Sequence, residues 1–145
     1  MKLTIRLIKN KQELEQVFRI RKIVFVKGQN VPVELELNSL DDEAKHIIVK
    51  YGNKPIGTAR VRFFGDRAKV ERLAVLKKHR GKGIGRRALK YAIDYCKRKG
   101  VKEVILHAQY YAKEFYEKLG FKERGKRFME ANIEHIEMYM VPNRT

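Results

Sequence analysis

The chain has 145 residues, of which 34 are Lys or Arg and 17 are Asp or Glu, so its formal net charge at pH 7 is +17. With 43% hydrophobic residues it has the composition of a globular protein, and its length predicts one domain over residues 1–145. The apolar runs are far too short to span a bilayer. The first residues lack the apolar core of a signal peptide, so we expect a cytoplasmic protein.

The cysteine and histidine content and the surplus of basic residues limit the kinds of site and ligand that we expect. The single cysteine, Cys96, cannot form an internal disulfide, and its place on the apolar side of an expected helix predicts a buried thiol. The four histidines are scattered, so we expect no metal site. The basic surplus attracts anions. It fits an acidic ligand or nucleic acid, and equally the heavily charged surface of a heat-adapted protein.

The first third of the chain predicts a strand, a helix and a loop. Alternating apolar and polar residues predict the strand over residues 3–8. The helix has Asn10 as its N-cap and Glu13 as the partner in a capping box, and Gly28 ends it. Residues 29–44 are acidic and have no clear period. We therefore expect a loop there, either bordering a substrate site or plainly solvated.

The remaining patterns predict six more strands and two more helices. In chain order, the expected elements are strands over residues 46–51, 56–64 and 69–76, a helix up to Lys99, a strand over 101–108, a helix near 112–119, and strands over 121–129 and 133–141. The resulting order is β-α-β-β-β-α-β-α-β-β. It predicts an α/β (α+β) fold with a mixed central sheet of about seven strands and helices on both faces.

A basic, glycine-rich turn lies between the central strand and the helix that follows it. N–H groups at a helix start, with the positive end of the helix dipole behind them, bind phosphate groups. Glycines let such a backbone approach its ligand closely, because they have no Cβ. We therefore predict a pyrophosphate site at this turn. Its residues are Arg80, Gly81, Lys82, Gly83, Ile84, Gly85 and Arg86.

Several kinds of turn compete for this assignment. The string of a Walker A loop is absent. A dinucleotide turn needs Gly-x-Gly-x-x-Gly and an acid at the end of the next strand, whereas the spacing here is Gly-x-Gly-x-Gly and that strand ends in His107-Ala108. An ordinary tight turn also accounts for such glycines. A third ligand-binding motif, Arg/Gln-x-x-Gly-x-Gly/Ala, matches residues 80–85 at every specified position.

This third motif holds the pyrophosphate of coenzyme A in the GNAT (GCN5-related) N-acetyltransferases, and the chain resembles that superfamily from about Leu3 to Met140. Residues 112–121 resemble the family's Asn-x-x-Ala-x-x-Phe-Tyr-x-x-x-Gly-Phe helix. The likeness is greatest to the small ElaA-like branch, where Gln109 is expected in place of Asn, although Gly28 stands where an acid is usual. Other residues that carry it are Val24-Phe25-Val26, Gly57 to Arg62, Glu71-Arg72, His107 and His135.

The resemblance implies acetyl-CoA as the cosubstrate and assigns residues to its site. The central strand of these enzymes splays from its neighbour at a bulge, and its N–H groups meet the pantetheine arm and the thioester. Here those residues are Leu73, Ala74 and Val75, and Gln109 is assigned to the same site. Tyr116 matches the tyrosine that protonates the leaving thiolate. An aromatic residue at this helical spacing is also typical of a core position.

The resemblance also implies an acceptor site. Glu71 matches a strand carboxylate that acts as general base in some GNAT enzymes, and an ion pair with Arg72 is the structural alternative. His135 and His107 are second choices for the base, because an unperturbed imidazole titrates near neutrality. Arginines in the acceptor pocket would suit an anionic amine. The residues assigned to acceptor binding are Arg21, Arg60, Arg62 and His135.

The sequence thus predicts an N-acetyltransferase that passes an acetyl group from acetyl-CoA to a primary amine of a small molecule or protein. The amine is expected to attack directly in a ternary complex. The alternative from another class is a basic nucleic-acid-binding module that keeps the fold, although no basic motif interleaved with aromatic residues is present. The sequence does not decide whether the protein forms a homodimer through the final hairpin. We expect neither a membrane nor a metal as a partner.

Overall fold

The computed structural model describes residues 2–32, 41 and 43–142, so most of the expected acidic loop (33–40 and 42) lies outside the described residues. The elements are β1 (Leu3–Leu7), α1 (Lys11–Arg21), η1 (Lys22–Lys27), β2 (Lys45–Tyr51), β3 (Lys54–Phe64), β4 (Arg67–Val75), η3 (Lys77–His79), α3 (Ile84–Arg98), β5 (Glu103–Gln109), η4 (Tyr110–Ala112), α4 (Lys113–Glu117), β6 (Lys122–Glu130) and β7 (Ile133–Met140).

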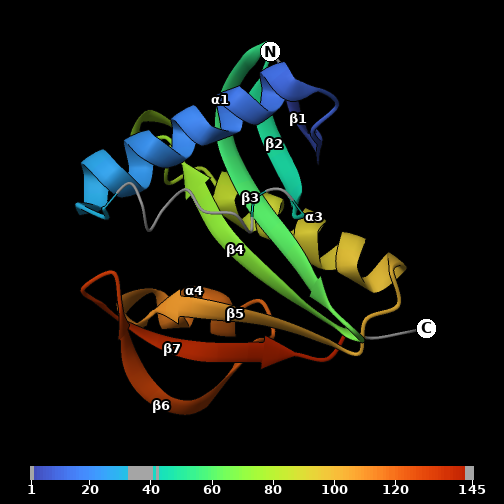
Figure 1. Ribbon diagram of the computed structural model, residues 1–145, viewed down its shortest axis with the longest axis vertical. Helices are drawn as coiled ribbons and strands as arrows, with labels where there is room; N and C mark the ends of the chain where they lie inside the picture. Colours follow the sequence, from blue (N-terminus) through green and yellow to red (C-terminus); the bar gives the residue numbers. More distant parts are fainter. Residues whose placement is uncertain (1, 33–40, 42, 143–145) are drawn as a thin grey trace.

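Seven strands form one mixed sheet in the order β1-β2-β3-β4-β5-β7-β6. Neighbouring strands run antiparallel, except that β4 and β5 are parallel. Figure 1 shows α1 crossing one face of β2, β3 and β4, while α3 passes behind these strands. The arrangement confirms the predicted mixed sheet with helices on both faces.

The two parallel strands at the centre of the sheet separate along their length. Within the described part of the chain, β4 pairs with β5 only from Arg67 to Lys69, and the strands then diverge toward their C-terminal ends (Figure 1). Beyond this point β4 bulges, because Arg72 and Leu73 together lie opposite the single residue Ala59 of β3, and Arg72 has a φ of 55°. The β4 edge is therefore open to a ligand between the strands.

The main core lies between the sheet and α3. Leu89, Ala92 and Cys96 of α3 pack with Val61 of β3 and Val104 of β5. Cys96 is fully buried, and burial raises the pKa of its thiol to about 12. The prediction of a buried thiol is confirmed, and the packing fixes α3 and its N-terminus against the open edge of β4.

The first helix begins as predicted, but its last turns form a π-helix. The Asn10 side chain accepts a hydrogen bond from the Glu13 N–H at 2.9 Å. Gly28 is the C-cap, as predicted, but the helix is not regular up to that residue, because Lys22–Lys27 form the π-helix η1. Its wider turn changes which side chains face the sheet, and Phe25 lines the cavity described below.

None of the helices in the described ranges is long and apolar enough to cross a membrane.

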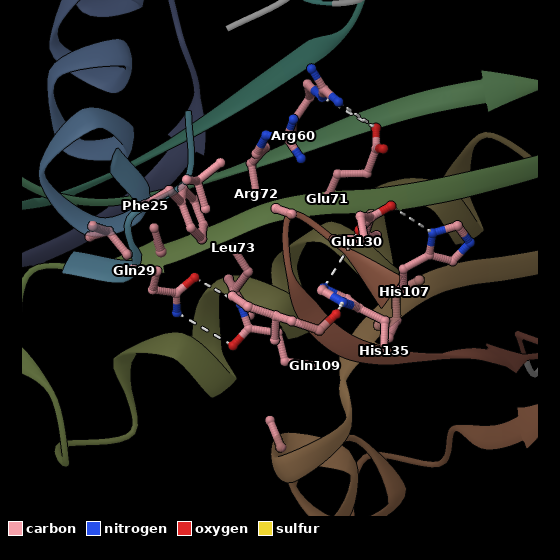
Figure 2. Close-up of a pocket in the computed structure, with 18 of the residues that line it drawn as sticks. Phe25, Gln29, Arg60, Glu71, Arg72, Leu73, His107, Gln109, Glu130 and His135 are labelled. Carbon is pink, nitrogen blue, oxygen red and sulfur yellow. Dashed lines mark hydrogen bonds and ion pairs between the residues drawn. The ribbon is translucent and has the colours of Figure 1, made fainter. Parts of the chain in front are cut away.

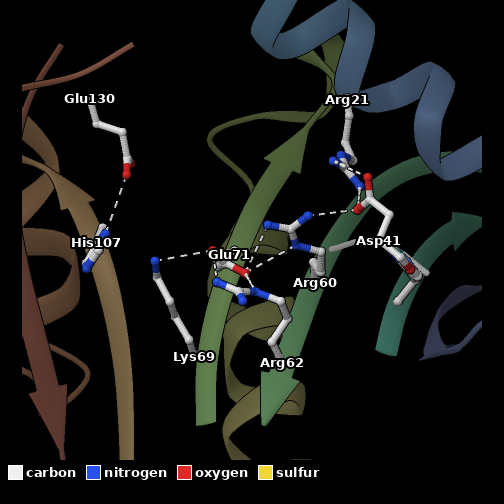
Figure 3. Close-up of polar contacts among 9 residues, drawn as sticks. Arg21, Asp41, Arg60, Arg62, Lys69, Glu71, His107 and Glu130 are labelled. Carbon is white, nitrogen blue, oxygen red and sulfur yellow. Dashed lines mark hydrogen bonds and ion pairs between the residues drawn. The ribbon is translucent and has the colours of Figure 1, made fainter. Parts of the chain in front are cut away.

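A buried pair of arginines fastens the end of α1 to β3. Asp41 Oδ1 lies 2.8 Å from Arg21 Nη1 and 2.8 Å from Arg60 Nη1 (Figure 3). The exposed fractions are 0% for Arg21, 1% for Arg60 and 7% for Asp41. Burial acts to raise the pKa of the Asp41 carboxyl, but the hydrogen bonds from both arginines outweigh it and lower that pKa. Asp41 therefore stays ionised between two cations.

We expect Asp41→Asn to lower the free energy of unfolding by about 3–5 kcal/mol, because it leaves Arg21 and Arg60 without their shared carboxylate in the interior. Urea denaturation measures the change. The matched control is Asp66→Asn, since Asp66 is exposed and its contact with Lys102 is 3.7 Å long. This control should change stability by at most about 0.5 kcal/mol. Equal effects of the two substitutions would contradict the role given to Asp41.

Candidate active site

A cavity of about 700 Å³ fills the gap between the diverging strands β4 and β5 (Figure 2). Its walls also include the end of the first helix, the middle of β3, α4 and the turn between β6 and β7. It brings together most of the side chains that the sequence analysis assigns to one site. Those lining it are Arg60, Arg62, Glu71, Leu73, Ala74, Val75, Arg80, Gln109, Tyr116 and His135.

A second hollow of about 410 Å³ lies at the N-terminus of α3. It shares Leu73, Ala74, Val75 and Arg80 with the first cavity, so the two spaces meet along β4. Of the predicted turn residues, Lys82 is exposed to solvent, and the others line this hollow. They are Arg80, Gly81, Gly83, Ile84, Gly85 and Arg86.

The glycines of the turn are needed for their backbone angles. Gly81 and Gly83 both have a φ of 78°, in the left-handed region that favours glycine. A Cβ at either position would meet no atom within 4 Å, so crowding by the protein itself is not the reason for them. Gly83 is the N-cap of α3, and this helix start has no side-chain cap in the described part of the chain. Its N–H groups are suited to an anion.

Tyr116 belongs to α4 and lines the cavity. Its ring packs edge to face against Phe115 and Phe121, and the Phe121 N–H donates to the Tyr116 carbonyl at 3.2 Å, which closes the end of α4. Burial raises the pKa of the Tyr116 hydroxyl to about 12. The hydroxyl is therefore protonated at neutral pH and is equipped to donate a proton.

Glu71 is surrounded by cations. Its carboxylate accepts hydrogen bonds from Arg60 Nη2 at 3.0 Å and Arg62 Nη2 at 3.1 Å, and Lys69 Nζ lies 3.3 Å away (Figure 3). Burial acts to raise the pKa of Glu71, but the Arg62 hydrogen bond and the charges of Arg60 and Lys69 bring it down to about 2. Glu71 thus forms ion pairs with three cations besides the Arg72 that the sequence analysis named as its structural partner.

The arginines assigned to acceptor binding occupy different places. Arg21 is fully buried behind Asp41 and is not among the residues that line the cavity. Arg60 reaches the cavity wall, but its guanidinium spans Asp41 and Glu71 and is only 1% exposed. Arg62 keeps a partly exposed side chain in the wall. The structure therefore brings Arg62, but not Arg21, to a position where it can meet a ligand.

The sequence analysis did not single out Glu130, which joins two histidines across the cavity. Glu130 Oε1 lies 3.5 Å from His107 Nδ1, and Glu130 Oε2 lies 3.5 Å from His135 Nε2 (Figure 2). His107 Nε2 is also 3.3 Å from Glu137 Oε1. Glu130 is the last residue of β6, and nothing in its local sequence distinguishes it from the other acids of the chain. Only the pairing of β6, β7 and β5 brings the cluster together.

A pair of amides crosses the cavity below the bulge. Gln109 Nε2 donates to Gln29 Oε1 at 2.8 Å, and the Tyr111 hydroxyl donates to Gln109 Oε1 (Figure 2). Gln29 follows the π-helix, whereas Gln109 ends β5, so the pair connects the two sides of the gap. Among the described residues, no group of three or more His, Cys, Asp or Glu side chains is arranged to hold a metal ion.

The depressed pKa of Glu71 predicts an acid-sensitive contribution to stability. The folded pKa is about 2 and the ordinary value is 4.5, so the contribution is complete above about pH 4.5 and is lost as the pH falls toward 2. Its size is roughly 3 kcal/mol. We expect the difference in free energy of unfolding between wild type and Glu71→Gln to shrink over this window in urea titrations. A difference that stays constant from pH 6 to about pH 2 would contradict the ion pairs.

Comparisons with known proteins agree with this geometry. Residues 11–142 match the family model described as an acetyltransferase (GNAT) domain. The chain is 40% identical over 131 residues to the uncharacterized N-acetyltransferase YjcF of Bacillus subtilis, covering 90% of this chain and 94% of that protein. Two solved structures share its fold. Escherichia coli ElaA has a TM-score of 0.87 at 22% identity, with 96% and 99% of the two chains covered.

The second solved structure is a GNAT family acetyltransferase from Elizabethkingia anophelis with acetyl-CoA bound. It has a TM-score of 0.76 at 16% identity, and the match covers 97% of this chain and 98% of that chain. The family model spans most of the sequence, and the YjcF relative exceeds 30% identity over nearly its whole length. The splayed strands, the bulge and the uncapped glycine turn are the features that the resemblance predicted. The chain belongs to the GNAT acetyltransferase family and is an acyltransferase of that family.

Proposed function

We propose that this protein transfers the acetyl group of acetyl-CoA to a primary amine of a small-molecule or protein acceptor, by direct attack within a ternary complex. The observation that carries the proposal is that the N-terminus of α3 and the open edge of β4 face two hollows that meet. A diphosphate at the helix start and an extended arm along β4 would place the thioester in the larger cavity. The amine would then enter the same cavity from its other side.

The donor half rests on charge and backbone geometry. Arg80, Lys82 and Arg86 surround the left-handed turn at Gly81 and Gly83, and they add positive charge to the helix dipole. Arg80 is held in place because its Nε donates to the Val75 carbonyl at 2.9 Å. This end of the site suits the pyrophosphate of coenzyme A. Leu73, Ala74 and Val75 then border the path of the pantetheine arm, with Gln109 at its inner end.

The transfer needs a proton donor for the departing thiolate. Tyr116 lines the cavity, and its raised pKa of about 12 keeps the proton on the oxygen at neutral pH. That proton is therefore present when the thiolate leaves the tetrahedral intermediate. We assign this donation to Tyr116. On the acceptor side, Arg62 and His135 are the assigned residues that the cavity exposes.

Thermal shift is the direct test of the donor site. Melting temperatures are compared with acetyl-CoA, coenzyme A, NAD and a short oligonucleotide at two salt concentrations. A ligand at a hundredfold excess over its Kd stabilises the folded state by about 2.7 kcal/mol. We expect stabilisation by both forms of coenzyme A. Stabilisation by the oligonucleotide alone, with a steep salt dependence, would favour the nucleic-acid-binding alternative and overturn the proposal.

We expect Gly83→Val to weaken coenzyme A binding by at least about tenfold, because a β-branched residue resists a φ of 78° and the helix start must then shift. Isothermal titration gives the Kd. The matched control is Gly65→Val, which forces the same residue into a positive φ of 57° in the turn between β3 and β4, away from both hollows. The control should bind coenzyme A as wild type does. An unchanged Kd for Gly83→Val would show that this turn is not the pyrophosphate site.

We expect Tyr116→Phe to lower kcat by about a hundredfold or more while the Kd of coenzyme A stays nearly unchanged, because only the transferable proton is removed. Thiol release from saturating acetyl-CoA measures kcat, with a panel of an alkylamine, an amino sugar phosphate and a lysine peptide as acceptors. Tyr51→Phe, an exposed tyrosine of β2, is the matched control and should keep the wild-type rate. A loss of coenzyme A affinity with full kcat would assign Tyr116 to binding instead.

A further inference from the structure

An amine acceptor must lose a proton before it attacks, and Glu71 is poorly suited to take it. An alkylammonium resembles a lysine side chain, whose pKa is about 10.4. The Glu71 carboxylate has a pKa of about 2 and is engaged by Arg60, Arg62 and Lys69. A group so weakly basic is a poor partner for such a proton. The proton acceptor must therefore be sought among the other side chains that line the cavity.

His135 has the geometry of a base. Its Nδ1 lies 2.7 Å from the Ile133 carbonyl oxygen. A carbonyl can only accept a hydrogen bond, so Nδ1 carries the proton, and the neutral ring has its lone pair on Nε2. The side chain is 8% exposed, and the ring stacks on Phe128 at 5.9 Å between centroids. The backbone and the aromatic ring thus hold one orientation, with Nε2 beside Glu130.

The space next to Nε2 calls for a hydrogen-bond donor. His135 Nε2 and Glu130 Oε2 are both acceptors when the imidazole is neutral, and they lie 3.5 Å apart. Glu130 remains ionised because the hydrogen bond and charge of His107 lower its pKa, with further contributions from His135 and Lys69. Two acceptors so close together are stabilised by a cationic donor between them or by protonation of the ring.

The charged groups of this cluster come from four strands. Glu130 belongs to β6, His107 to β5, and Lys69 and Glu71 to β4, while Glu137 of β7 holds the far side of His107. The nearest cation of β4, Lys69, is itself paired with Glu71 at 3.3 Å. The Glu130 carboxylate lies 3.5 Å from His135 Nε2 and favours a positive charge at that point.

From this arrangement we propose that His135 is the general base of the transfer and that Glu130 is its positioning residue, the two forming a site for the ammonium form of the acceptor. The inference rests on the proposed acetyl transfer. Glu130 would attract the ammonium and stabilise the imidazolium that forms when His135 takes the proton.

The proton balance of the step is complete with the residues present. The ammonium gives one proton to His135 Nε2, and the freed nitrogen attacks the thioester carbon. The C–N bond forms, the C–S bond breaks, and Tyr116 gives its proton to the departing sulfur. The nitrogen then loses a second proton, which restores Tyr116, and His135 returns its proton to water. The products are an amide, coenzyme A with a free thiol, and one proton in solution.

The test is the pH dependence of thiol release from saturating acetyl-CoA, with water alone and with the panel of an alkylamine, an amino sugar phosphate and a lysine peptide. Wild type should show a rate that rises with pH through a single inflection, as the general base loses its proton. We expect His135→Gln to lose about a hundredfold in rate together with this inflection, while its Kd for coenzyme A is unchanged. Glu130→Gln should lower the rate at saturating acetyl-CoA while the Kd for coenzyme A stays unchanged, because the imidazolium loses its carboxylate.

The matched control for Glu130→Gln is Glu134→Gln in the same hairpin. Glu134 pairs with Arg127, is half exposed and does not line the cavity, so its rate and inflection should stay at wild-type values. An inflection that persists in His135→Gln would overturn the assignment of the base. Binding of acetyl-CoA by wild type without thiol release to water or to any amine would overturn it as well. Absence of acetyl-CoA binding would instead overturn the proposed function itself.

Discussion

The divergence of β4 from β5 is the constraint on which the rest of the site depends. Two adjacent parallel strands normally stay paired along their length, because each unpaired backbone group costs free energy in the interior. Here the ladder stops at Lys69, and the bulge at Arg72 turns the remaining strand away. The space that opens exposes backbone of β4 to a ligand. It is also where side chains from β3, β5 and the β6–β7 hairpin converge.

Buried charge accompanies this open centre. Asp41, Arg60 and Glu71 form a continuous chain of ion pairs from the end of α1, across β3, to the bulged strand (Figure 3). Such pairs are costly to desolvate and contribute less to stability than their number suggests, but removing one partner is expensive. Their effect is to fix the wall of the cavity while leaving Arg62 and the two histidines facing it.

The two ends of the site use different physical means. At the donor end the backbone provides the binding groups, because left-handed glycines and a helix start without a side-chain cap suit a polyanion. At the acceptor end it falls to side chains, with a carboxylate and two imidazoles held by strand pairing and ring stacking. Because of this difference, the donor site can be predicted from one short sequence motif. No single motif predicts the acceptor site.

Local patterns were enough to predict the order of the elements, the glycine turn, the central strand and the position of Tyr116, because each depends on residues close together in the chain. The π-helix after Arg21 was missed, since a change of helical pitch depends on packing against the sheet. The sequence analysis assigned Arg21 and Arg60 to acceptor binding and Glu71 to the general base, but whether they face a ligand or one another depends on tertiary packing as well. That question, and the meeting of Glu130 with His135, depends on partners supplied by distant strands, so only the tertiary structure decided them.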